Sequence, residues 1–347
     1  MKKPVRLIGG LSLILIFLTA WGAGAKESYP HKTQIAKHPA PALEIVEARE
    51  MKFLIDPAKV GYTPEKGLTA IWERVKRFAK KENIALKEKD FNADGLTYST
   101  KVYYDTPEGD LTRLGYVVRI TTKYFTGKPV SAALTVKFID RDTPERVFTS
   151  MPEEEDAAIE ENVGPAPAYT LDTYLEKSVK VDVELSGIPV TLADFAELVP
   201  HLGTLGLDPG VRLTGVGAYS IRMKPGFAIL PGMPFPAGIS MEAWLPVESG
   251  ERAFVYDFSF GYPTGDYYDM SRTHTAAENI IQKMYEKLDR EIGLPGNAEW
   301  RGSKAAYLRK SGLNFPEYTG IKKLEMRSYK PPKKSKDGTI SFNDDPS

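Results

Sequence analysis

Charged side chains recur at alternate positions in several segments of this sequence that have strand character. Residues two apart in an extended strand project from the same face, so each segment offers one charged face. If these faces converge on one interior, Lys and Arg can bind phosphate oxygens and the carboxylates can hold a divalent cation. The basic positions are Lys52, Arg119, Lys137, Arg212 and Arg222, and the acidic positions are Glu50, Glu242 and Asp257.

The same alternation has a simpler explanation. Charged residues at alternate positions can lie on the solvent-facing side of an antiparallel sheet, where they form cross-strand pairs. A shared interior would instead hold several cations and a few carboxylates, which are costly to bury without partners. Alternation alone therefore favours the solvent-facing arrangement over the charged interior.

The elements that carry these residues follow a definite order along the chain. An opening strand, an amphipathic helix and then a run of strands with a late helix predict an α+β domain around a large antiparallel sheet or barrel. Residues 153–156 are expected to form a solvated acidic loop, and the alternate aromatics of 254–262 to pack the sheet. We expect strands at 51–55, 96–105, 116–124, 132–140, 179–185, 211–223, 239–244 and 253–260, and helices at 67–81, 192–199 and 276–292.

The first 25 residues have the three parts of a secretory signal peptide. A basic start at 1–6 is followed by an apolar run at 7–21 and by small residues at 23–25. We predict cleavage after Ala25 and a periplasmic or secreted mature protein, with no membrane attachment after cleavage. An uncleaved anchor is the alternative, but the run is shorter than the ~20 residues that a membrane span needs.

Composition excludes several classes of function. The absence of cysteine excludes disulfides, a thiolate nucleophile and a cysteine metal site. The 46 basic and 46 acidic residues give no support to nucleic-acid binding as the main role. The four histidines are scattered, without a zinc-binding spacing. Along the chain we expect a linker at 26–44, a barrel domain at 45–295 and an extension at 296–347, whose tail from about residue 330 is expected to be disordered.

Four short motifs, taken together, resemble those of the CYTH family, the triphosphate tunnel proteins. They are an opening Glu-x-Lys, a Tyr-Asp-Thr turn, an Arg-x-Gly-x-x-x-Arg stretch and a Thr-x-Lys strand. The resemblance spans residues 45–292, is strongest over 103–138, and implies a sheet closed into a tunnel-like β-barrel with flanking helices. The residues that carry it are Glu50 and Lys52, Tyr104, Asp105 and Thr106, Arg113, Gly115 and Arg119, and Thr135 and Lys137.

The resemblance also implies roles for the charged positions. The interior would bind polyphosphate or a phosphorylated small molecule, with Mg²⁺ or Mn²⁺ as its ion, and hydrolysis would need positioning and charge neutralisation more than a protein nucleophile. Glu50 and Asp257 would then be catalytic. The implied phosphate ligands are Lys52, Arg119, Lys137 and Arg222, with Arg212 as a substitute for Arg222, and the implied metal ligands are Glu50, Glu242 and Asp257.

Three positions depart from the family pattern. Ala48 stands where the first glutamate of the opening strand is expected, and Glu47 lies on the opposite strand face. Thr121 replaces a second arginine, and Ser259 leaves the closing strand with Asp257 alone. Phosphate binding is therefore better supported than metal-dependent phosphoanhydride hydrolysis. The alternatives are a non-catalytic ligand-binding or cell-envelope protein on the same fold, and an unrelated β-rich carrier with an apolar interior.

Overall fold

The computed structural model describes most of the chain from residue 46 onward. The predicted signal peptide and linker lie outside the described residues, as does the predicted tail apart from two short strands. The described ranges are 46–88, 96–143, 145–154, 156–230, 236–246, 252–263, 271–300 and 303–310, and the two-residue strands 317–318, 333–334 and 340–341. No helix in these ranges is long and apolar enough to cross a membrane.

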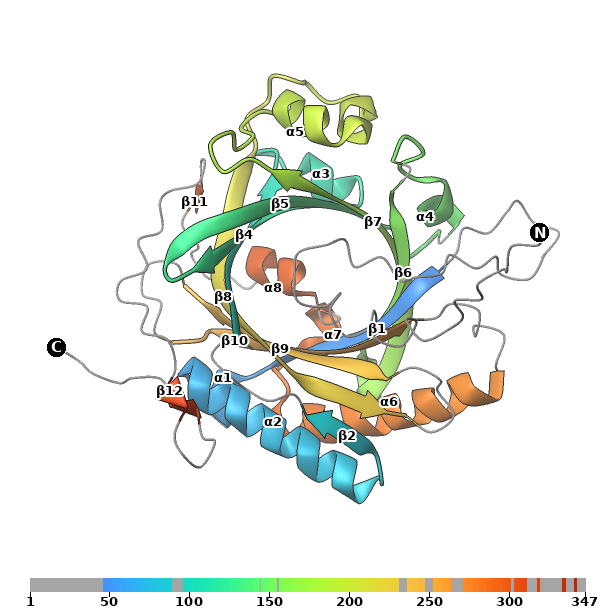
Figure 1. Cartoon of the computed structure of the whole chain (residues 1–347). Helices are drawn as coiled ribbons and strands as arrows, with labels where there is room; N and C mark the ends of the chain where they lie inside the picture. Colours follow the sequence, from blue (N-terminus) through green and yellow to red (C-terminus); the bar gives the residue numbers. More distant parts are fainter. Residues whose placement is uncertain are drawn as a thin grey trace, which may run out of the picture.

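Nine strands close into a barrel in the order β8-β3-β4-β5-β7-β6-β1-β10-β9, and β9 returns to pair with β8 (Figure 1). Neighbouring strands are antiparallel except β1 and β6, which are parallel. The α+β barrel with flanking helices predicted from the sequence is confirmed. Its strands are β1 (Val46–Ile55), β3 (Leu96–Asp105), β4 (Tyr116–Phe125), β5 (Lys128–Ile139), β6 (Ala158–Ala166), β7 (Thr170–Val183), β8 (Thr214–Ile229), β9 (Ala237–Leu245) and β10 (Val255–Pro263).

The remaining strands are short. Strands β2 (Ala85–Glu88) and β11 (Glu317–Tyr318) both pair with β8, and β12 (Lys333–Lys334) pairs with β13 (Ile340–Ser341).

Helices cover the barrel on two sides, and helices also lie within the ring of strands (Figure 1). The long helices α2 and α6 run along one side, and α3, α4 and α5 lie on the opposite side. Inside the ring lie α8 and the short α7. Their bounds are α1 (Pro57–Val60), α2 (Pro64–Lys81), α3 (Asp110–Arg113), α4 (Glu145–Thr149), α5 (Leu192–Leu198), α6 (Ser271–Ile292), α7 (Asn297–Trp300) and α8 (Lys304–Lys310), with 3-10 helices η3 (Pro167–Tyr169) and η4 (Pro200–Thr204).

The outer faces of the barrel strands are apolar, and the helices bury them. Phe53 of β1 and Phe258 of β10 pack with Phe78 of α2 in one core, and Val136 of β5 packs with Phe195 of α5 in a second. Each such side chain contributes roughly 1.5–3 kcal/mol when fully buried. Because successive strand residues point to opposite faces, the charged positions between these apolar ones face the barrel interior. The predicted packing role of the aromatics at 254–262 is confirmed for Phe258.

Helix α2 approaches β10 closely at Gly67. A Cβ built there would lie 2.0 Å from Cζ of Tyr256. The Tyr256 hydroxyl donates hydrogen bonds to the carbonyl oxygens of Gly61 at 2.9 Å and Thr63 at 2.8 Å. The ring is thereby fixed under the helix, and only a residue without a side chain fits above it.

Several elements differ from the sequence expectation. Strand β6 was not predicted, because Glu160, Glu161 and Asn162 interrupt its apolar pattern and Pro165 argues against a strand. Strand β7 begins at Thr170 rather than residue 179, and β8 at Thr214 rather than 211. Helix α8 lies beyond residue 295, where the sequence showed no clear periodicity.

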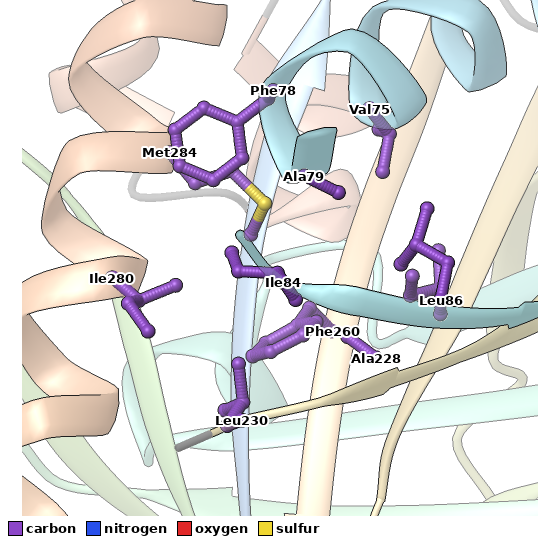
Figure 2. A pocket seen from close by; sticks show the side chains of 11 residues that line it. Val75, Phe78, Ala79, Ile84, Leu86, Ala228, Leu230, Phe260, Ile280 and Met284 are labelled. Carbon is purple, nitrogen blue, oxygen red and sulfur yellow. The ribbon is translucent and has the colours of Figure 1, made fainter. Parts of the chain in front are cut away.

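A small apolar pocket lies outside the barrel, where α2 and α6 meet the strands (Figure 2). Its lining includes Phe78 of α2, Met284 of α6 and Phe260 of β10, and every lining residue is apolar. The pocket belongs to the packing between helices and barrel and is separate from the charged interior.

Candidate functional site

The strand register brings charged and polar side chains from all nine barrel strands to one interior. Lys52 lies opposite Ser259, Asp257 opposite Glu242, and Glu242 opposite Arg222. On the other wall, Arg119 lies between Tyr103 and Thr135. The charged positions that alternate inward are Glu50, Lys52, Lys101, Arg119, Lys137, Glu160, Glu176, Arg222, Glu242 and Asp257.

Two buried carboxylates on β9 and β10 form an acidic wall, and lysines already bind both. Glu242 is 0% and Asp257 2% exposed. Lys101 forms an ion pair with Oε1 of Glu242. Lys304 of α8 reaches Oε2 of Glu242 at 3.3 Å and Oδ2 of Asp257 at 2.6 Å. Arg222 Nε lies 3.8 Å from Glu242.

These partners set the protonation of the acidic wall. Burial raises the pKa of Glu242, but the charges of Lys101, Lys304 and Arg222 outweigh it and hold that pKa well below its usual range. Burial raises the pKa of Asp257, and Lys304 only partly opposes this. Burial lowers the pKa of Lys304, yet Asp257 and Glu242 leave it above the ordinary lysine value. Lys304 is therefore a charged ammonium at neutral pH.

A second charged cluster joins β1, β5, β6 and β7. Lys52 Nζ donates to Oδ1 of Asn162 at 2.5 Å and lies 3.6 Å from Oε2 of Glu50, and Lys137 forms an ion pair with Glu176. Burial raises the pKa of Glu50, but Lys52, Lys304 and Lys137 together lower it below the ordinary value. One carboxylate therefore experiences cations from both clusters, so they share one electrostatic environment.

The facing carboxyl groups of Glu160 and Glu176 have very different pKa values. They are register partners on β6 and β7. Burial raises the pKa of Glu160 to about 7, with Glu176 and Glu50 adding to the rise. Burial also raises the pKa of Glu176, but Lys137 and Lys52 lower it to about 2. At pH 7 Glu176 is therefore ionised and Glu160 is about half protonated.

Arg119 differs from the other interior cations, because no carboxylate pairs with it among the described residues. Its Nη2 lies 3.5 Å from Oγ1 of Thr135, and its Nε has no hydrogen-bond partner in the described part of the chain. Two further buried polar atoms in the interior, Oγ1 of Thr121 and Nδ2 of Asn162, likewise lack a partner there. Unsatisfied buried donors are costly, so this set is suited to an anionic ligand.

Most of the predicted site residues come together in the interior, and one does not. Arg212 is exposed, precedes β8, and pairs by its backbone with Thr191 next to α5. Arg212 is not on the inner strand face because β8 begins only at Thr214, two residues further along the chain. Lys52, Arg119, Lys137 and Arg222 and the acids Glu50, Glu242 and Asp257 all occupy inward positions.

Sequence reasoning missed several interior residues. Lys101 lies in a strand whose bounds were predicted correctly, and its alternation with Ser99 and Tyr103 is a signal that could have found it. Glu160 was missed because β6 was not predicted, and Glu176 because the predicted strand began at residue 179, after the actual start of β7. Lys304 carried no signal, because only the folded chain brings α8 to the acidic wall.

The Tyr-Asp-Thr turn after β3 has a structural role. The Asp105 carboxylate accepts hydrogen bonds from the backbone N–H groups of Leu111 at 2.9 Å and Thr112 at 3.2 Å, which fixes the start of α3. Arg309 of α8 lies 3.7 Å from the same carboxylate. Arg113, another motif residue, has a side chain 68% exposed and pairs with Asp110 outside the interior. Asp105 and Arg113 therefore position neighbouring elements and do not contact the barrel interior as ligand-binding groups.

Helix α8 fills one end of the interior. Ala305 and Leu308 pack against Leu54, Tyr103 and Trp244, which share the inward face of their strands with the charged residues. At the preceding α7, Asn297 accepts from the backbone N–H of Leu54 at 3.1 Å and donates to its carbonyl oxygen at 2.7 Å. Helix α8 is thus part of the barrel interior, and α7 is fixed to β1.

The acidic wall does not fit a preformed divalent-cation site. Mg²⁺ needs a near-octahedral set of oxygen ligands. Both oxygens of Glu242 already face lysine ammoniums, and only Oδ1 of Asp257 lacks a hydrogen-bond partner among the described residues. The described residues contain no group of three or more His, Cys, Asp or Glu side chains that could hold a metal ion. The assignment of Glu50, Glu242 and Asp257 to Mg²⁺ or Mn²⁺ stays a prediction.

No protein-family model and no curated protein sequence matches the chain. Among solved structures, it is similar to a Hippeastrum protein described as an adenylyl cyclase candidate with a dominant triphosphatase activity, at 12% identity and a TM-score of 0.39, covering 78% of this chain and 98% of that one. It is also similar to an adenylate cyclase candidate from Bacillus halodurans, at 11% identity and a TM-score of 0.35, covering 74% and 96%. A protein from Pyrococcus horikoshii OT3 matches at 13% identity and a TM-score of 0.29, covering 68% and 89%.

These similarities concern the fold and carry no weight for activity. The closed barrel and the inward positions of Glu50, Lys52, Arg119 and Lys137 agree with the resemblance to the CYTH family.

Proposed function

We propose that this protein binds a phosphate-chain anion, such as inorganic polyphosphate, inside its barrel. The observation that carries the proposal is Arg119, an inward arginine with no carboxylate partner in the described part of the chain. A phosphate chain offers many oxygens that can accept charge-assisted hydrogen bonds from such a group. Lys52, Lys137 and Arg222 lie on the surrounding inner faces and would extend the contact along the chain.

The proposal gives hydrolysis a minor part. Of the carboxylates assigned to catalysis, Asp257 is held by Lys304, and Glu50 lies 3.6 Å from Lys52. We therefore propose binding with, at most, slow release of phosphate. Mg²⁺ or Mn²⁺ enters this proposal only as an ion that the phosphate oxygens can carry, and binding of the phosphate chain by the barrel residues does not require it.

The predicted signal peptide adds a compartment to the proposal. An exported protein would meet little ATP, which favours polyphosphate or a phosphorylated small molecule as the ligand. A non-catalytic role in the cell envelope fits the same barrel and the same ligand.

Calorimetric titration with tripolyphosphate in EDTA tests the proposal. We expect wild-type protein to bind and Arg119→Ala to weaken the Kd by roughly ten- to a hundredfold, because a hydrogen bond to a charged group contributes about 1.5–3 kcal/mol. Arg212→Ala is the matched control, since Arg212 is exposed outside the barrel, and its Kd should equal that of the wild type.

Two outcomes would count against this function. If wild-type protein binds neither tripolyphosphate nor long-chain polyphosphate, the barrel is not a phosphate-chain receptor. If Arg119→Ala and Arg212→Ala weaken binding equally while both remain folded by circular dichroism, the anion binds to the surface.

A further inference from the structure

Lysine side chains occupy the acidic wall of the barrel from two directions. Lys101 comes from β3 of the barrel, and Lys304 from α8 inside it. Lys304 Nζ bridges Asp257 Oδ2 at 2.6 Å and Glu242 Oε2 at 3.3 Å, while Lys101 pairs with the other oxygen of Glu242.

Both carboxylates of the acidic wall have a lysine beside them. Glu242 and Asp257 are register neighbours on β9 and β10, and both are almost fully buried. Two adjacent buried carboxylates repel each other unless positive charge lies between them. The ammonium of Lys304 lies between the two carboxylates, and Lys101 pairs with Glu242, so the two lysines stand where a divalent cation would otherwise bind.

Lys304 is held in place by its helix. Its neighbours Ala305 and Leu308 pack inside the barrel against Trp244, and Arg309 lies 3.7 Å from Asp105. The Nζ atoms of Lys101 and Lys304 lie 5.4 Å and 5.6 Å from the centre of the Trp244 ring, within the range of cation–π attraction. Because these contacts already restrict the Lys304 side chain, little further conformational entropy is lost when it pairs with the carboxylates.

We infer that Lys304, together with Lys101, takes the place of a divalent cation at Glu242 and Asp257, so that this wall excludes metal and the barrel binds its anion without one. The exclusion of metal stands on the lysine contacts alone. The metal-free binding of an anion rests in addition on the proposed function. The ammonium of Lys304 then acts as a fixed internal counter-ion beside the ligand.

Manganese binding followed by electron paramagnetic resonance tests the exclusion of metal in the full chain. We expect no stoichiometric Mn²⁺ site in wild-type protein. Lys101→Met/Lys304→Met keeps most of both side-chain stems but removes both amino groups from the carboxylates, and should bind one Mn²⁺ per chain at least tenfold more tightly than wild type. Lys283→Met is the control, because Lys283 lies on the surface with a side chain 61% exposed, and it should behave like wild type.

The outcomes separate the two claims. A wild-type Mn²⁺ site that is lost in Glu242→Gln would overturn the inference, as would a folded double variant that binds no more Mn²⁺ than wild type. Should the double variant not fold, wild-type tripolyphosphate binding decides: binding that persists in EDTA supports the inference, and loss of binding in EDTA contradicts it. If wild-type protein binds neither tripolyphosphate nor Mn²⁺, the proposed function fails and the exclusion of metal stands.

Discussion

At the scale of single residues, the interior cations fall into two groups by their partners. Lys101, Lys137 and Lys304 each contact a carboxylate, so their charges are largely neutralised within the fold. Arg119 has only the Thr135 hydroxyl at 3.5 Å among the described residues. Removing a paired lysine would leave a buried carboxylate uncompensated, which costs stability, whereas removing Arg119 should cost ligand affinity first.

The Glu160–Glu176 pair predicts a pH dependence of stability. The pKa of Glu160 is raised to about 7 in the folded protein by burial, above its ordinary value of 4.5. A carboxyl with a raised folded pKa favours the folded state at low pH, and this contribution is lost as pH rises through 7. Urea unfolding between pH 5 and 8 should therefore show stability falling with pH in the wild type.

Glu160→Gln mimics the protonated carboxyl and should flatten this slope. Glu108→Gln, on an exposed turn, is the control and should leave the slope unchanged. A Glu160→Gln slope equal to that of wild type would show that Glu160 is ionised in the folded protein throughout this range.

At the scale of elements, the contact of α2 with β10 depends on Gly67. Gly67→Ala would place a methyl group 2.0 Å from the Tyr256 ring, whose hydroxyl is fixed by two carbonyl oxygens. Overpacking of this kind typically costs about 1–3 kcal/mol. Gly187→Ala is the matched control, because no atom lies within 4 Å of its added Cβ, and it should change the unfolding free energy by less than about 0.5 kcal/mol. Equal urea midpoints for the two variants would contradict the close packing seen here.

The elements that sequence reasoning placed well are those with one apolar face. Strand β3 was predicted with its bounds, and α2 to within a few residues, because apolar side chains recur there at strand or helix spacing. Strand β6 was missed because its inward residues are Glu160 and Asn162 and its end holds Pro165, which obscures any alternation. Helix α8 could not be predicted as part of the site, since no periodic pattern reveals which barrel wall a distant helix contacts.

At the scale of the whole molecule, the barrel reverses the usual placement of polar and apolar residues. Its apolar strand faces point outward under α2, α5 and α6, and its charges point inward. Alternation in the sequence shows that charged and apolar residues lie on opposite strand faces, but not which face points into the barrel. That became clear only from the helices that cover the apolar face in the structure. As a consequence, the interior holds a buried charge network, and burying these charges is unfavourable unless they are paired with each other or with a ligand.

The last prediction concerns where the whole protein works. The basic start, the apolar run and the small residues Ala23, Gly24 and Ala25 predict export with cleavage after Ala25. Intact-mass analysis of the full-length gene product should therefore find a mature chain that begins at Lys26 in the exported fraction. Ala25→Arg should block cleavage, because the residue at the cut must be small, and should leave a heavier, membrane-associated protein. A wild-type product that keeps Met1 and stays on the membrane would overturn this prediction, and the case for an extracytoplasmic polyphosphate ligand would weaken with it.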